Sequence, residues 1–107
     1  MAAYLDDRSL LHIPGGSGLA GDYAGREAIC ALLDRMTVAT DGSLRFETTS
    51  TTVAGIGHVR LSGWLSGGRG ERALRTAAAL EATVADAHIR EAWFSCSDQP
   101  AWDAFWS

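Results

Sequence analysis

The sequence contains no lysine, and its nine basic residues are therefore all arginine, against thirteen acidic residues. A chain without a lysine amine cannot form a Schiff base or a P-loop of the Walker type. The net charge of −4 leaves no excess of basic residues to meet the phosphates of nucleic acid or an anionic membrane. These absences argue against nucleic acid and membranes as partners.

Cysteine is also scarce, and the two present, Cys30 and Cys96, are far apart in the sequence. A zinc site or a disulfide scaffold would need more ligands or more cysteines, so we expect reduced thiols and no metal. No stretch approaches the roughly 20 apolar residues of a membrane span. Residues 1–11 lack the basic start and apolar run of a signal peptide. We therefore expect a cytoplasmic protein.

The 107 residues are enough for one hydrophobic core, so we expect a single domain over residues 1–107. Apolar residues recur with helical spacing in residues 25–40, at Ile29, Leu32, Leu33 and Met36. A second, short helix is expected near the end, capped by Ser97 or Asp98 and with Pro100 in its first turn.

Strand patterns fill most of the remaining chain. The Ala-rich residues 73–84 could form a helix, but their alternation favours a strand with Leu74, Thr76, Ala78, Leu80, Ala82 and Val84 on one face. The other expected strands are residues 9–13, 44–55, 58–67 and 89–97. Short connections imply antiparallel hairpins, and helices beside an antiparallel sheet make an α+β domain.

Residues 16–21, GSGLAG, satisfy the pattern G-x-G-x-x-G of dinucleotide-binding turns. Such a site needs a helix that begins inside the glycine turn and an acidic residue at the end of the next parallel strand. Here the helical pattern begins only near Arg26, and the next strand ends in TTVAG without a carboxylate. We therefore interpret the glycines as turn residues and expect no cofactor.

The surroundings of this loop resemble a known family. Residues 10–29 are similar to a segment of SnoaL-like proteins, in the nuclear-transport-factor-two-like (NTF2-like) superfamily of polyketide cyclases and ketosteroid isomerases. Residues 88–107 resemble the family's last strand, with Ile-x-Glu-x-Trp, an aspartate and a closing Phe-Trp. The matching positions of the first segment are His12, Ile13, Pro14, Gly15, Leu19, Ala20, Gly21, Tyr23, Gly25 and Ile29.

This resemblance implies a cone, in which a curved antiparallel sheet wraps a pocket and a few helices close it, as in a cystatin-like roll. It also implies a homodimer formed through the convex face of the sheet. The family usually carries a helix or two before the His-Pro-Gly strand, whereas here only residues 1–8 precede it. Either the pocket is more open than usual or the true start lies further upstream.

His12 is the first candidate catalytic residue. It lies between Leu11 and Ile13 on an expected strand, so its side chain points away from theirs, toward the cone interior in the family arrangement. An imidazole there titrates near neutral pH and can serve as a general base or hydrogen-bond donor. The alternative is a histidine that bonds a loop carbonyl at the pocket rim.

Tyr23 and Asp98 are the other catalytic candidates. The phenol of Tyr23 could donate to a developing oxyanion, or the ring could pack the loop against the helix. Asp98 could be a carboxylate at the cone mouth with a pKa raised by burial, or the cap of the last helix.

Three apolar residues are candidates for contacting a substrate: Trp64, Trp93 and Leu80. The tryptophans could line an apolar site, or serve as core or dimer contacts. Leu80 follows Ala77, Ala78 and Ala79 on a middle strand, where catalytic relatives place Asp, Asn or His in the pocket. This lack of polar groups weakens the enzyme hypothesis and favours a small apolar pocket.

Two functions therefore stay open. The first is a cofactor-independent isomerase, cyclase or hydrolase that acts by acid–base chemistry on a hydrophobic small molecule. The second is a non-catalytic module of the same fold, which binds an apolar ligand or dimerises. The position of His12 relative to an enclosed cavity separates them: convergence there with a carboxylate or a phenol favours the enzyme.

Overall fold

A computed structural model describes residues 2–106 of the chain. Six strands form one sheet in the order β2-β1-β6-β5-β4-β3, and neighbouring strands are antiparallel except β1 and β6, which are parallel. The elements in chain order are η1 (Ala2–Tyr4), β1 (Leu10–Ile13), β2 (Gly21–Ala24), α1 (Arg26–Ala39), β3 (Arg45–Val53), β4 (His58–Arg69), β5 (Arg72–Ala85), β6 (His88–Cys96) and α2 (Gln99–Phe105).

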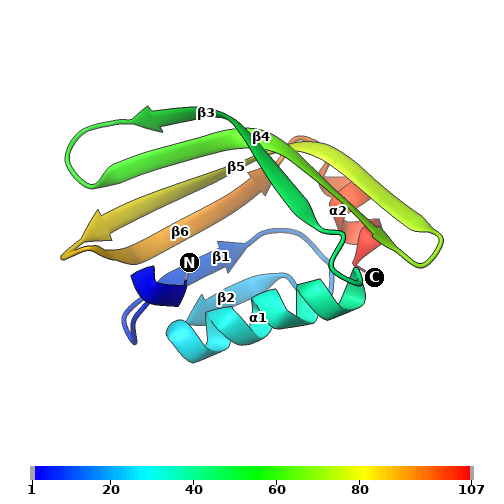
Figure 1. The fold of residues 1–107 in the computed structure, drawn as a ribbon, viewed down its shortest axis with the longest axis horizontal. Helices are drawn as coiled ribbons and strands as arrows, with labels where there is room; N and C mark the ends of the chain where they lie inside the picture. Colours follow the sequence, from blue (N-terminus) through cyan, green and yellow to red (C-terminus); the bar gives the residue numbers. More distant parts are fainter. Residues whose placement is uncertain (1, 107) are drawn as a thin grey trace.

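The sheet curves, and α1 lies across the open side of the curve while α2 closes one end (Figure 1). This arrangement confirms the predicted α+β fold with a curved sheet and few helices. The helix α1 buries Ile29, Leu32 and Met36, three of the four residues whose spacing predicted it. No helix within residues 2–106 is long and apolar enough to cross a membrane.

Two features of the sheet were not predicted. The four-residue strand β2 contains Gly21 and Asp22, which have low strand propensity, and it forms by pairing with β1 across the glycine loop. The strand β1 pairs in parallel with β6, through Leu10, Leu11 and His12. Such a pairing joins segments about 80 residues apart, and local sequence patterns carry no information about it.

Along β5, Leu74, Thr76, Ala78 and Ala82 are buried as the alternation predicts, whereas Val84, beyond a register shift after Thr83, is exposed. Their face of the strand is the inner face of the sheet. The turn from β5 to β6 places Asp86 and Ala87 at positive φ, 53° and 62°, as a two-residue hairpin turn that continues the right-handed twist requires.

The strand β3 bends at a β-bulge between Thr48 and Ser50, opposite Gly63 of β4. A Cβ atom on Gly63 would lie 2.8 Å from the carbonyl carbon of Glu47 and 2.9 Å from the Cα of Thr48. Both distances are shorter than van der Waals contact, so only glycine permits this approach. The bulge curves the sheet at this point and carries β3 over the interior.

The end of the sheet near α2 is filled by aromatic side chains. The ring centroid of Trp102 lies 4.6 Å from that of Phe94 and 5.6 Å from that of Trp106, and Phe105 contacts Trp106 edge to face at 4.8 Å. Such tilted pairs stabilise packing by about 0.5–1.5 kcal/mol each beyond the burial of area. This cluster fixes α2 against β5 and β6.

Candidate functional site

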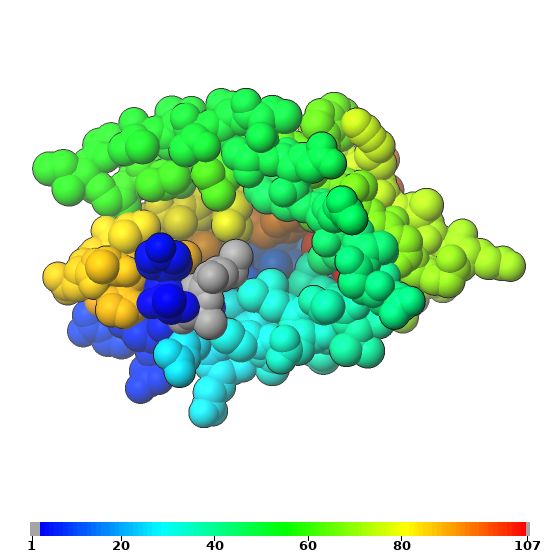
Figure 2. Space-filling view, in the orientation of Figure 1, coloured from blue at the N-terminus to red at the C-terminus, as the bar shows by residue number. Residues whose placement is uncertain are grey.

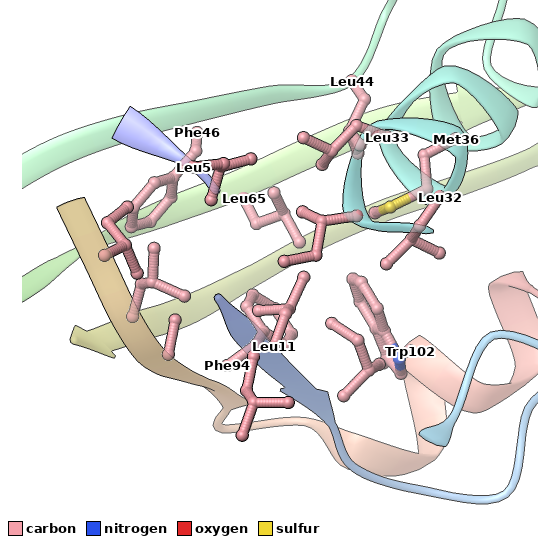
Figure 3. A pocket seen from close by; sticks show the side chains of 16 residues that line it. Leu5, Leu11, Leu32, Leu33, Met36, Leu44, Phe46, Leu65, Phe94 and Trp102 are labelled. Atoms are coloured by element: carbon pink, nitrogen blue, oxygen red, sulfur yellow. The ribbon is translucent and has the colours of Figure 1, made fainter. Parts of the chain in front are cut away.

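The inner face of the sheet and α1 enclose a cavity of about 300 Å³. The sixteen described side chains that line it are apolar, and Figure 3 shows those of β1, β3, β4, β6 and both helices directed toward one space. The lining residues are Leu5, Leu10, Leu11, Ile13, Ile29, Leu32, Leu33, Met36, Leu44, Phe46, Leu65, Leu80, Ile89, Ala92, Phe94 and Trp102.

The cavity is not fully enclosed. Figure 2 shows the molecule hollowed between β3 and α1, beside the N-terminal turn, with β5 and β6 visible at the bottom of the hollow. Leu33 and Leu44 line the cavity from α1 and from the segment that leads into β3. A small molecule can therefore reach the interior between these two elements.

The lining has no group that could transfer a proton. It contains no histidine, carboxylate, tyrosine or cysteine among the described residues. Such a surface offers a ligand dispersion contacts and removal of apolar area from water, at about 25 cal/mol per Å². The cavity can therefore hold an apolar molecule, but its walls supply neither acid nor base.

The prediction that His12 faces the interior is wrong. Leu11 and Ile13 line the cavity, so the alternation of β1 turns His12 to the outer face of the sheet. The sequence-based reasoning placed the side chain correctly relative to its neighbours. It assigned the wrong face of the strand to the interior. The side chains of Leu11 and Ile13, and not that of His12, fill the apolar cavity.

On the outer face His12 sits between two carboxylates. Its Nδ1 lies 2.6 Å from Oδ1 of Asp22 on β2, and its Nε2 lies 2.6 Å from Oε2 of Glu91 on β6. Its ring also stacks on that of Trp93, with centroids 5.8 Å apart. The hydrogen bonds to Asp22 and then to Glu91 raise the pKa of His12 above its ordinary value, against a smaller opposing effect of burial.

Tyr23 and Asp98 also lie outside the cavity. The hydroxyl of Tyr23 donates to the carbonyl oxygen of Leu19 at 2.7 Å, and the ring packs against the hydrophobic core. Asp98 accepts a hydrogen bond from the backbone N–H of Ala101 at 3.1 Å and so caps α2. His12, Tyr23 and Asp98 do not converge on one space.

Of the predicted substrate contacts, Leu80 lines the cavity and the two tryptophans do not. Trp64 is 44% exposed and Trp93 38% exposed, and both lie on the outer face of the sheet. The guanidinium of Arg75 lies 4.5 Å from the centroid of the Trp64 ring, a cation–π contact. The tryptophans are therefore surface residues here, and a ligand in the cavity would not touch them.

A second, shallower depression of about 450 Å³ lies on the outer face, over β4, β5 and β6. Ala77 and Ala79 of β5 form its floor, and Trp64 and Arg60 stand on its β4 side. Arg60 forms an ion pair with Glu81.

No group of three or more histidine, cysteine, aspartate or glutamate side chains within residues 2–106 is arranged to hold a metal ion. Both cysteines are free thiols. The Cys96 side chain is half-buried beside α2, and burial raises the pKa of its thiol.

Sequence reasoning missed most of the cavity-forming residues, which lie on seven helices and strands and, for Leu5 and Leu44, on connecting segments. The helical spacing of Ile29, Leu32, Leu33 and Met36 was the available signal, since it marks a helix face that must be buried. Phe46, Leu65 and Phe94 lie on three different strands. Their convergence depends on the curvature of the sheet, which single-strand patterns do not encode.

The chain has the NTF2-like fold, as comparison with solved structures shows. Bal32a, from a soil-derived mobile gene cassette, is 27% identical over 98% of this chain and 80% of its own, with a TM-score of 0.94. A protein with a cystatin-like fold from Xanthomonas campestris is 22% identical over 98% and 81%, with a TM-score of 0.91. An NTF2-like protein from Burkholderia xenovorans LB400 is 20% identical over 98% and 79%, at 0.76.

Other solved structures of this fold include ketosteroid isomerase-like and SnoaL-like proteins, in agreement with the resemblance read from the sequence. One, from Catenulispora acidiphila, is in complex with trimethylamine, and TerC was co-crystallised with polyporic acid. No protein-family model and no curated protein sequence matches the chain.

Proposed function

We propose that this chain, whose fold is that of the NTF2-like superfamily, binds an uncharged and largely hydrocarbon small molecule in its inner cavity without converting it. The observation that carries the proposal is the lining of that cavity, sixteen apolar side chains with no titratable group. Two proteins with the same fold, one in complex with trimethylamine and one co-crystallised with polyporic acid, support small-molecule binding.

The volume of the cavity limits the size of the ligand. A cavity of about 150 Å³ lined by aliphatic and aromatic side chains binds benzene. The cavity here is about 300 Å³, which corresponds to about two or three aromatic rings or a hydrocarbon chain of similar volume. A ligand that carries a charge would lose its hydration without finding a partner among the lining residues.

Binding is favoured over catalysis because the three predicted catalytic residues lie elsewhere. His12 is held between two carboxylates on the opposite face of the sheet, and Asp98 is occupied by the N-terminus of α2. A general base must come within about 3 Å of the proton that it removes. His12 cannot do so for a ligand in the cavity while Leu11 and Ile13 hold β1 in its present orientation.

Titration with the fluorescent probe N-phenyl-1-naphthylamine, which is uncharged near neutral pH, tests this proposal. We expect saturable binding with a stoichiometry of one probe per chain. Leu33→Trp enlarges a half-buried side chain that lines the cavity from α1, and should weaken binding at least about tenfold by filling the entrance. Val38→Trp on the same helix is the control, because Val38 is 81% exposed and lies outside the cavity.

Both variants must unfold at temperatures near that of the wild type for the comparison to hold. Native mass spectrometry of the purified protein adds a direct search for a retained apolar compound. Equal probe affinity in Leu33→Trp and Val38→Trp would contradict binding in this cavity. Turnover of a bound compound that is lost in His12→Ala would favour the enzyme instead.

We also propose that two copies of the chain associate through the outer face of the sheet. Trp64 lines a depression floored by Ala77 and Ala79, and Trp93 is also exposed on this face of the sheet. Large exposed aromatic side chains and shallow hollows are typical of interfaces. Sedimentation velocity should give a dimer that Ala79→Arg converts to a monomer. A monomeric wild type at high concentration would contradict this proposal.

A further inference from the structure

The cluster around His12 joins three strands at the edge of the sheet. Asp22 stands opposite His12 in the antiparallel register of β1 and β2, and Glu91 lies two residues before its parallel partner Trp93 on β6. Each ring nitrogen of His12 is 2.6 Å from a carboxylate oxygen. Both contacts can be hydrogen bonds at once only if both nitrogens carry a proton, that is, in the imidazolium form.

The strand β2 has few other attachments. It is an edge strand, its residues Gly21, Asp22 and Ala24 are exposed, and within residues 2–106 β1 is the one strand with which it pairs. The strand β1 in turn is four residues long and pairs with β6 through three residues. Short edge pairings of this kind open at a lower free energy than the long central strands do.

Opening of β1 would disturb the cavity directly, because Leu11 and Ile13, the neighbours of His12, line it. Both are buried. The same four residues therefore carry an apolar wall on one face and the charged cluster on the other.

We propose that protonated His12 is an ionic latch that fastens the β1–β2 hairpin to β6, so that closure of the inner cavity depends on pH. The structural part of this inference stands on the His12 cluster alone. The effect on a ligand rests in addition on the proposed binding function.

The charged surroundings of His12 support this role. Asp22 faces it from β2, and Glu91 and the Trp93 ring face it from β6. Within residues 2–106, the ion pairs of Asp22 and Glu91 are those with His12. The next charge, Glu81 on β5, is already paired with Arg60 and lies 3.6 Å from His58. Without its proton, His12 would leave two carboxylates facing a neutral ring.

The direction of the pH dependence follows from the raised pKa of His12, which the hydrogen bonds to Asp22 and Glu91 cause. A group whose pKa is higher in the folded state contributes stability that is fully present below its unfolded value, about 6.5. That contribution is lost as pH rises through the folded pKa. The latch is therefore closed in mildly acidic solution and released in alkaline solution.

Hydrogen exchange measured by mass spectrometry tests the latch without a ligand. Peptides that cover residues 10–24 should lose protection about five- to tenfold between about pH 6 and about pH 9, after division by the intrinsic exchange rates, as one or two ion pairs of modest strength predict. A peptide from β5 should keep its protection. In His12→Gln, residues 10–24 should be less protected at both pH values, with no change between them.

His58→Gln is the matched control, since His58 lies on the same outer face and does not touch the hairpin. It should retain the wild-type pH dependence. Asp22→Asn and Glu91→Gln should each reduce the effect by about half. Unchanged protection of residues 10–24 in the wild type across this range, or an unchanged pH effect in His12→Gln, would overturn the latch.

Titration with N-phenyl-1-naphthylamine at the same two pH values tests the coupling to the cavity. We expect the probe to bind about five- to tenfold more weakly at about pH 9 in the wild type and equally at both values in His12→Gln, by the same ion-pair magnitudes. If the probe binds at neither pH, the proposed function fails while the exchange result still decides the latch. If probe affinity is the same at both pH values while hydrogen exchange changes with pH, the proposed coupling between the latch and the cavity is wrong.

Discussion

Gly63→Ala should destabilise the protein far more than Gly68→Ala, although both glycines lie in β4. Gly63 stands opposite the β-bulge of β3, where an added Cβ would lie 2.8 Å from the carbonyl carbon of Glu47 and 2.9 Å from the Cα of Thr48. Both atoms belong to the backbone and cannot rotate away. At Gly68 the nearest atoms would lie 3.8 Å away, in ordinary contact.

The cost can be worked out from this geometry. The strand β3 must move by on the order of 1 Å, which strains packing by about 1–3 kcal/mol. The movement weakens about two backbone hydrogen bonds at the bulge, at about 0.5–1.5 kcal/mol each. The sum is about 2–6 kcal/mol, out of a total of about 5–15 kcal/mol for a domain of this size. Gly68→Ala should stay within about 0.5 kcal/mol of the wild type.

Urea unfolding followed by far-UV circular dichroism measures both variants, with the midpoint and slope compared. We expect Gly63→Ala to shift the thermal midpoint down by at least about 10 °C. Probe affinity should fall as well, because β3 carries Phe46 into the cavity wall. The reasoning is refuted if the two variants unfold within about 0.5 kcal/mol of each other.

Three further predictions concern single side chains. Asp98→Ala removes the cap of α2 and should cost about 1 kcal/mol in urea unfolding, most of which Asp98→Asn should restore. Ser9→Ala should cost about 1–3 kcal/mol, because the buried Ser9 hydroxyl donates to the carbonyl of Ile89 and accepts from the N–H of Asp6. If Ser9→Thr, which keeps the hydroxyl, costs as much, the loss comes from poor packing and not from lost hydrogen bonds. Cys96 should react slowly with iodoacetamide at neutral pH, because burial raises the pKa of its thiol. The Cys30→Ser variant isolates this reaction, and modification as fast as that of a free thiol would contradict it.

Elements that depend on local sequence patterns could be predicted, whereas those that depend on pairing between distant segments could not. The helix α1 and the long strands follow from spacing and alternation, since Leu32 or Leu74 is buried because of its position within one element. The strand β2 does not follow, since Gly21 and Asp22 have little strand propensity and pair with β1 only because the glycine loop returns the chain. The resemblance to a family supplied the curvature that these patterns lack.

The site shows the same division more sharply. Alternation correctly placed His12 opposite Leu11 and Ile13, but it cannot tell which face of a strand is inside. The apolar side chains of Leu11 and Ile13 indicated that their face of the strand lies inside. The family resemblance led to the opposite assignment. Asp22 and Glu91, which define the surroundings of His12, lie on strands whose pairing with β1 no local pattern indicated.

Because the charged side chains lie outside the cavity, the apolar lining determines which ligands such a protein would select. Among the described lining residues the indole N–H of Trp102, buried without a hydrogen-bond partner, is the one donor of a conventional hydrogen bond, so selectivity arises mainly from exclusion. A hydroxyl or amide that enters without a partner costs about 1–3 kcal/mol, or about five- to 150-fold in affinity. The size of a ligand and its lack of polar groups therefore determine whether it binds in the cavity. The polar chemistry of β1 lies on its other face, where His12 can act on the position of the wall and not on the ligand itself.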